Sequence, residues 1–130
     1  MKYLLDTHVL LWALENNPNL PDHIKDIILD ENNVIYLSTA SLLEISIKHK
    51  KHPDILKYTV EEIINYSTRA GYIFLSLSYE SVLMHSKFDF GFHSDPFDQI
   101  LIAQSLSNNM KLITHDEAIN IISPKQTVFF

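Results

Sequence analysis

The stretch "YLLDTHVLLWALE", residues 3–15, decides the fold class of this chain. Its first residues form a short apolar run that stops at Asp6, as a buried strand would. The residues after Asp6 are typical of a helix, with Asp6 or Thr7 as its N-terminal cap. The stretch therefore predicts a strand, an acidic residue and a helix in direct succession.

The same alternation continues along the chain. Further apolar or β-branched runs predict strands at residues 34–38, 72–77, 111–114 and 126–130, and helical patterns separate them. Because these runs are apolar throughout rather than alternating with polar residues, they predict a parallel sheet that is covered on both faces. We expect one α/β domain over residues 1–130: a three-layer α/β/α sandwich with a mainly parallel, four- or five-stranded sheet.

Composition narrows the class of protein. Hydrophobic residues make up 46% of the chain and charged residues 20%, which is a globular balance. The chain has no cysteine, so disulfides and thiolate metal sites are excluded, and no apolar stretch reaches membrane-spanning length. We expect a soluble, cytoplasmic protein without a membrane partner.

The net charge of −6 does not exclude nucleic acid as a binding partner, because cations held by the carboxylates would attract phosphate.

Four acidic residues are predicted to converge on one edge of the sheet. Asp6 and Asp116 each follow a strand, and Glu44 lies in the helix after the second strand. Asp98 lies in the first turn of a helix that is apolar in nearly every direction and therefore buried. Open parallel sheets bind ligands at the carboxyl ends of their strands. Carboxylates that meet there repel one another, and a divalent cation relieves the repulsion.

Each acid also has a purely structural interpretation. Asp95 before Pro96 has the pattern of a helix cap, and Asp98 suits the capping-box position three residues later. Asp6 and Asp116 can likewise cap the helices that follow them, and Glu44 can reach solvent. These interpretations stay open for each residue taken singly, but they do not explain why four acids fall at one edge.

Together, "LLDTHVLLWAL", the glutamate in the helix after the second strand, "DPFDQILIAQS" and "LITHD" resemble the PIN-domain nucleases. The resemblance is greatest to the VapC-like toxins of bacterial toxin–antitoxin pairs and covers essentially the whole chain. It implies that Mg²⁺ or Mn²⁺ is held by Asp6, Glu44, Asp98 and Asp116, with Asp95 in a supporting role. It also implies a homodimer and an antitoxin partner that places a basic side chain in the acidic cleft. His8 is a departure, because many relatives have asparagine there.

The implied chemistry is the hydrolysis of RNA phosphodiesters by a metal-activated water. Thr7 and Thr114 are expected to orient the ligating carboxylates through hydrogen bonds. Lys48, Lys50 and Lys51 are candidates for contacts with RNA phosphates, although basic residues near a helix end also complement its dipole. Aromatic residues at 87–93 are candidates for base stacking, with core packing as the alternative.

Two other functions remain as alternatives. One is a catalytically silent PIN-like binding module. The other is a haloacid-dehalogenase-like phosphatase, because Asp6 ends a strand and precedes a threonine. That mechanism requires a second acid two residues later, where this chain has His8.

Overall fold

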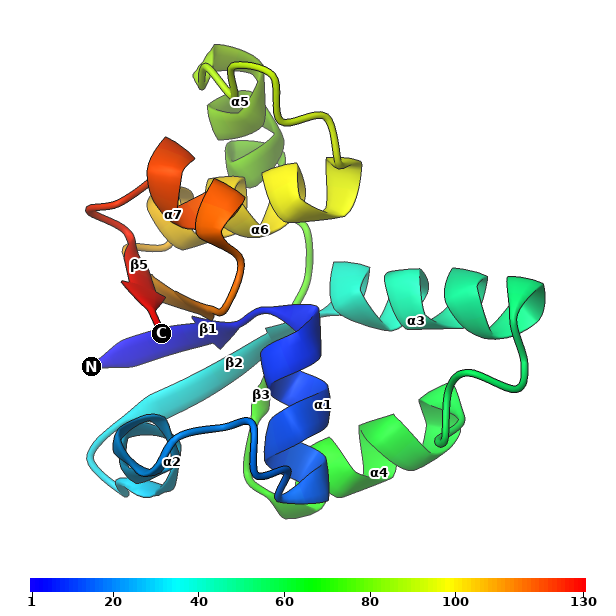
Figure 1. Ribbon diagram of the computed structural model, residues 1–130. Helices are drawn as coiled ribbons and strands as arrows, with labels where there is room; N and C mark the ends of the chain where they lie inside the picture. Colours follow the sequence, from blue (N-terminus) through cyan, green and yellow to red (C-terminus); the bar gives the residue numbers. More distant parts are fainter.

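A single five-stranded parallel sheet forms the centre of the protein in a computed structural model that describes residues 1–130 (Figure 1). Its strands are β1 (Lys2–Leu5), β2 (Val34–Ser38), β3 (Ile73–Leu75), β4 (Lys111–Thr114) and β5 (Thr127–Phe129). They lie in the order β3-β2-β1-β4-β5, and every neighbouring pair is parallel. The predicted parallel sheet is confirmed.

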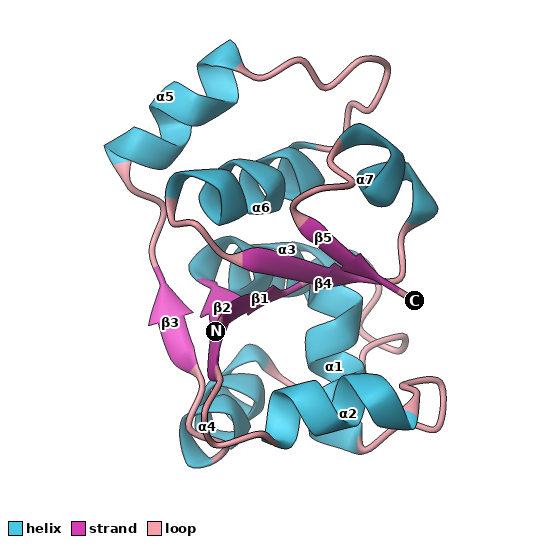
Figure 2. Cartoon of the chain, turned by 90° about the vertical axis from the view of Figure 1, so that its left-hand side faces the viewer, coloured by secondary structure: helices cyan, strands magenta, loops and turns pink.

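Helices cover both faces of this sheet (Figure 2). The helices α1 (Thr7–Glu15), α2 (Asp22–Leu29) and α4 (Val60–Arg69) lie on one side, and α5 (Tyr79–Lys87), α6 (Pro96–Ser107) and α7 (Glu117–Ile122) lie on the other. The helix α3 (Thr39–Lys51) starts at the end of β2 and extends beyond the sheet (Figure 1). This arrangement confirms the predicted α/β/α sandwich. No helix combines the length and the apolar character needed to cross a membrane.

Residues that alternate along each strand enter two separate cores. In β1, Tyr3 and Leu5 belong to the core under α1, α2 and α4, whereas Leu4 belongs to the core under α6 and α7. In the same way Ile113 and Leu112 of β4 face opposite sides. Because both faces of these strands are buried, their central residues are apolar on both sides, and a charged residue stands only at the first position of each, Lys2 and Lys111.

Local sequence sets the helix ends. The Ser38 hydroxyl caps α3, and Thr59 forms a capping box with Glu62 at the start of α4. Asp95 caps α6 with Pro96 in the first helical position, as predicted. After α4 the chain turns at Gly71, whose φ of 81° is a conformation that a residue with a Cβ rarely adopts.

One strand is shorter than the sequence predicts. The strand expected at 72–77 covers only Ile73–Leu75, because β3 is an edge strand that pairs with β2 alone. Its last residue pairs with Ser38, where β2 ends, so the residues after Leu75 have no strand beside them.

The strand order reverses between β1 and β4. From β1 the chain moves outward through β2 to β3, then returns to place β4 on the other side of β1. The connections leave the carboxyl ends of β1 and β4 in opposite directions, which opens the crevice where open α/β sheets bind ligands. Asp6 follows β1 at this crevice, and Asp116 lies just beyond the end of β4.

Candidate active site

A cleft of about 500 Å³ opens at the carboxyl ends of β1 and β4. All four predicted metal-ligating residues line it, although they come from four separate parts of the chain. The eleven lining residues are Asp6, Thr7, His8, Trp12, Glu44, Lys48, Asp95, Asp98, His115, Asp116 and Glu117. Only one of the eleven is hydrophobic, so the cleft is strongly polar and rich in carboxylates.

Asp6 is the most constrained of these acids. Its side chain is almost fully buried, with 6% of the residue exposed. Asp6 Oδ1 accepts a hydrogen bond of 2.6 Å from the Thr7 backbone N–H, and Oδ2 accepts one of 2.7 Å from Thr114 Oγ1. Burial raises the pKa of Asp6, while the hydrogen bond from Thr114 acts in the opposite direction. The two bonds fix the carboxylate at the end of β1.

Glu44 is also buried, at 8% exposure, although it lies in a helix that leaves the sheet. Glu44 Oε1 accepts a 2.7 Å hydrogen bond from Thr7 Oγ1, which links the start of α1 to α3. Glu44 Oε2 lies 3.1 Å from Lys48 Nζ, one helical turn further on. Both oxygens of Glu44 therefore have partners at the wall of the cleft.

The three candidate RNA-binding lysines have different positions. Lys48 lines the acidic cleft, where it pairs with Glu44. Lys51 lines an adjacent groove of about 440 Å³ between α3 and the start of α6. Lys50 lines neither space. Of the three lysines, only Lys48 therefore lines the acidic cleft.

Asp98 is held by a histidine from the preceding loop. His93 Nε2 donates a hydrogen bond of 2.8 Å to Asp98 Oδ2. The His93 carbonyl accepts a 2.8 Å bond from Gln99 Nε2, and His85 Nε2 lies 2.9 Å from Gln99 Oε1. These contacts tie the loop and α5 to the first turn of α6.

The ionisation of Asp98 is unfavourable in this cleft. Burial raises the pKa of Asp98 to about 6, and the negative charges of Asp6, Asp95 and Asp116 act in the same direction. The hydrogen bond from His93 acts against them. A cation in the cleft would favour the charged form by the opposite electrostatic effect.

Asp95 and Asp116 cap the helices that follow them, as Asp6 does for α1, and all three sequence positions suggest this role. Asp95 Oδ1 accepts hydrogen bonds from the backbone N–H groups of Phe97 and Asp98, at 2.9 and 3.2 Å. Asp116 Oδ1 accepts one of 2.8 Å from the backbone N–H of Ala118. The other oxygen of Asp116 makes no hydrogen bond within the protein, so capping leaves it available to a ligand.

The donor set suits a hard divalent cation. Its oxygens are carboxylate oxygens, which Mg²⁺ and Mn²⁺ prefer, and magnesium usually keeps several waters beside one or two carboxylates. No three histidine or acidic side chains lie close enough together to form a preformed metal site. The chemistry of the residues therefore fits such an ion.

Several cleft residues were not singled out as site residues from the sequence. Trp12 and His115 both line the cleft. Their positions in the sequence could have indicated this, because Trp12 is one helical turn beyond His8 and His115 directly precedes Asp116. Glu117 also lines the cleft. His93 was not singled out either, because its contact with Asp98 depends on the fold of the loop.

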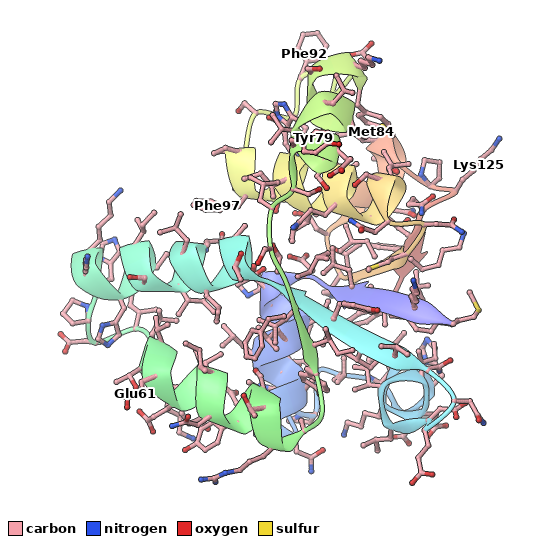
Figure 3. All side chains as sticks on the ribbon, turned by 180° about the vertical axis from the view of Figure 1, so that it is seen from behind. Glu61, Tyr79, Met84, Phe92, Phe97 and Lys125 are labelled. Carbon is pink, nitrogen blue, oxygen red and sulfur yellow. The ribbon has the colours of Figure 1, made fainter.

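The aromatic loop at 87–93 does not line the cleft. Phe88 and Phe90 pack against each other and belong to the core beside α6. Phe92 is fully exposed and points away from the rest of the molecule (Figure 3). Of the two interpretations of these aromatic residues, core packing holds for Phe88 and Phe90, which cover α6.

Comparison with known proteins identifies related sequences and folds. An uncharacterised protein of Methanocaldococcus jannaschii is 30% identical over 117 residues, which cover 90% of this chain and 72% of that protein. The fold is similar to a chain of VapBC2 from Rickettsia felis bound to a DNA fragment from its promoter. That match has a TM-score of 0.74 and 15% identity, and it covers 99% of this chain and 98% of the other.

A chain of a toxin–antitoxin complex from Klebsiella pneumoniae has the same fold. Its TM-score is 0.65 at 17% identity, with 97% of this chain and 95% of that chain covered. The model of the PIN domain matches residues 3–123, a range that contains every acid of the cleft. With this match over nearly its whole length, the chain belongs to the PIN domain family.

Proposed function

We propose that this protein is a metal-dependent endoribonuclease that hydrolyses RNA phosphodiesters. The observation that carries the proposal is the presence of Asp6, Glu44, Asp98 and Asp116 in one polar cleft. Membership of the PIN domain family supports nuclease activity, and the oxygen-rich donor set supports Mg²⁺ or Mn²⁺ as the cofactor.

In this proposal Asp6 and Asp98 are the principal ligands of the cation. Glu44 acts through a water or positions one, and Asp116 belongs to a second site. A bound divalent cation would lower the pKa of a water molecule and balance the charge that develops on the phosphate.

The chain's own contribution is to hold these groups in place before substrate arrives. Thr114 orients Asp6, Thr7 orients Glu44, and His93 orients Asp98 through the hydrogen bonds described above. Lys48 beside Glu44 provides a positive charge at the wall of the cleft, where it suits a phosphate of the substrate. Lys51 extends this contact from the adjacent groove, and Lys50, which lines neither space, would reach only RNA that continues beyond them.

The first test is cleavage of a mixed RNA pool by the purified protein with Mn²⁺, beside a sample with EDTA. Asp98→Asn should abolish cleavage while circular dichroism shows a folded protein. Asp26→Asn is the matched control, because Asp26 is an exposed aspartate of α2 outside the cleft. Cleavage that persists in EDTA or in Asp98→Asn would refute the proposal.

A catalytically silent PIN-like binding module is the second candidate. It is favoured by the adjacent groove, which offers Ile47, Ile55 and Phe97 to a binding partner. Titration calorimetry with Mn²⁺ separates the two functions, since only the nuclease requires the cation. Binding that Asp6→Asn removes supports the nuclease, and undetectable binding supports the module. The phosphatase alternative is set aside, because the chain matches the PIN domain family.

We further propose that the nuclease is the toxin of a toxin–antitoxin pair and acts in the cytoplasm. The fold shared with chains of VapBC2 and of a toxin–antitoxin complex supports this proposal. The antitoxin would place a basic side chain in the acidic cleft. Its apolar residues would lie in the adjacent groove, which includes Ile47, Ile55 and Phe97. Induced expression should arrest bacterial growth, and expression of Asp98→Asn should not.

We also propose that the protein is a homodimer. Exposed apolar side chains gather on neighbouring segments at the β3 edge and on α5, including Phe74, Tyr79, Val82 and Leu83. Burial of such a surface in a second copy would remove it from water. Light scattering at micromolar concentration should give twice the mass of one chain, 15.1 kDa. The monomer mass would contradict a dimer.

A further inference from the structure

Three ring side chains form one wall of the acidic cleft, which we call the ring wall: His8, Trp12 and His115. The ring centroids of Trp12 and His115 are 5.6 Å apart, and those of His8 and Trp12 are 6.4 Å apart. None of these side chains has a role in the proposed metal site. Their presence among so many carboxylates therefore needs a separate explanation.

The topology of the sheet explains how the ring wall forms beside the acids. His8 lies two residues after Asp6, and Trp12 follows one turn further along α1. His115 directly precedes Asp116 at the end of β4. Because β1 and β4 are adjacent and parallel, rings that follow the two strands meet at the same edge as the acids.

The rings are only partly used in packing. Trp12 is half-buried against the core below α1, and Phe130 lies behind it with ring centroids 6.3 Å apart. His8 and His115 are both exposed. His115 stacks against Phe130 at 4.8 Å, which supports one face of the imidazole. The ring wall is thus braced by Phe130 and open toward the cleft.

We propose that the ring wall is a subsite that stacks an unpaired base of single-stranded RNA beside the acids. Every base has a flat π face, and aromatic and histidine side chains are the groups on which proteins stack bases. A phosphate bound at the carboxylates through a cation would carry its own base only a few ångströms away, within reach of such a wall. This inference rests on the proposed nuclease function.

The composition of the cleft favours a base over a peptide side chain. Trp12 is its only hydrophobic lining residue. A peptide that docks through apolar contacts finds more of them in the adjacent groove, which offers Ile47, Ile55, Leu56 and Phe97. A base needs only a flat ring to stack on and polar groups at its edge. His8 and Nε2 of His115 supply such groups, whereas Nδ1 of His115 is hydrogen-bonded to the Phe130 carbonyl oxygen.

The test uses Trp12 itself, since it is the only tryptophan of the chain. A hexaadenylate RNA is titrated into the protein with Ca²⁺ in place of Mn²⁺, and a gel verifies that the RNA stays intact. The matched ligand is an abasic hexamer with the same phosphates and no bases. Hexaadenylate should quench the fluorescence of Trp12 saturably. The abasic hexamer should bind about fivefold or more weakly, because it loses base stacking.

Variants locate the effect at the wall. His115→Ala and His8→Ala should each weaken hexaadenylate binding about fivefold or more and leave abasic binding unchanged. His23→Ala is the matched control, because His23 is an exposed histidine of α2 outside the cleft, and it should bind both ligands as the unaltered protein does. Equal affinity of the unaltered protein for the two hexamers would overturn the subsite, as would His115→Ala behaving like His23→Ala.

The outcome is separable from that of the nuclease proposal. If Mn²⁺-dependent cleavage is present but the hexamers bind equally, the subsite alone fails. If neither cleavage nor binding of either hexamer occurs, the nuclease proposal fails and the subsite with it. Quenching by hexa-arginine but not by hexaadenylate would overturn the subsite in favour of a basic peptide.

Discussion

Thr114 Oγ1 donates a hydrogen bond of 2.7 Å to Asp6 Oδ2, although the two residues are 108 positions apart. The same hydroxyl accepts a bond of 3.0 Å from the backbone N–H of Asp116. The pairing of β1 with β4 brings the Thr114 hydroxyl to the Asp6 carboxylate. Thr114 thus couples the acids that follow two strands, and its hydroxyl is fully buried between them.

Thr114→Val should weaken Mn²⁺ binding about tenfold or more, because Asp6 loses the hydrogen bond that orients it. Removing a residue that orients a metal ligand typically lowers metal affinity by this amount. Titration calorimetry measures the affinity. Thr114→Ser keeps the hydroxyl and should restore most of it, whereas Thr68→Val on the exposed face of α4 should have no effect. Equal affinities of the valine and serine variants would show that the hydrogen bond does not matter.

Asp98 should make the metal-free protein less stable as the pH rises. The folded-state pKa of about 6 lies above the ordinary value of 3.8 for an aspartate, so the folded protein binds the proton more tightly. This contribution to stability is fully present below about pH 3.8 and is lost as the pH rises through about 6. Chemical denaturation of the protein and of Asp98→Asn from pH 4 to 7 should show it.

Asp98→Asn removes the negative charge of the carboxylate, and this sets the expected difference in stability between the variant and the unaltered protein. At pH 7, Asp98→Asn should be more stable than the unaltered metal-free protein by about 1 kcal/mol, after allowance for solvent contact of the carboxylate. The advantage should shrink toward pH 4. Asp26→Asn, in contrast, should show no such trend, and a constant difference across the range would refute the raised pKa.

His93→Leu should raise the pKa of Asp98 further, because the hydrogen bond from His93 favours the charged carboxylate. The Asp98 carboxyl carbon can be followed by NMR as the pH changes. His52→Leu is the matched control, since His52 is exposed and does not line the acidic cleft. A midpoint that moves downward, or stays in place, would contradict the role of His93.

Mn²⁺ should stabilise the folded protein. A ligand that binds only the folded state at about 100 times its dissociation constant adds about 2.7 kcal/mol, so thermal unfolding should shift to higher temperature. Asp6→Asn should lose most of the shift. Glu61→Gln should keep it, because Glu61 is an exposed residue of α4 that does not line the cleft (Figure 3). A shift that survives Asp6→Asn would place the cation elsewhere.

Core packing should determine whether α6 keeps Asp98 in place. Leu101 is one turn below Asp98 on this helix and only 1% exposed in the core beneath it. Leu101→Ala should lower the free energy of unfolding by about 2–5 kcal/mol through the cavity it leaves. Denaturant titration measures this loss. Leu29→Ala at the exposed end of α2 should cost far less, and similar losses would show that α6 is not tightly packed.

Much of the architecture was evident in the sequence, because it depends on neighbouring residues. The apolar run before Asp6, the cap pattern of Asp95 and Pro96 and the helix after Ser38 each follow from local backbone and side-chain preferences. The order of acids along the chain also indicated which edge of a parallel sheet they would share.

The contacts between these segments were decided only by the tertiary structure. The strand order that places Thr114 against Asp6, the loop that brings His93 to Asp98, and the packing of Trp12 beside His115 join residues through space. No local preference specifies such pairs, because they result from burying both faces of one sheet at once. The sequence alone indicated which acids share one edge of the sheet, and the folded sheet determined their partners.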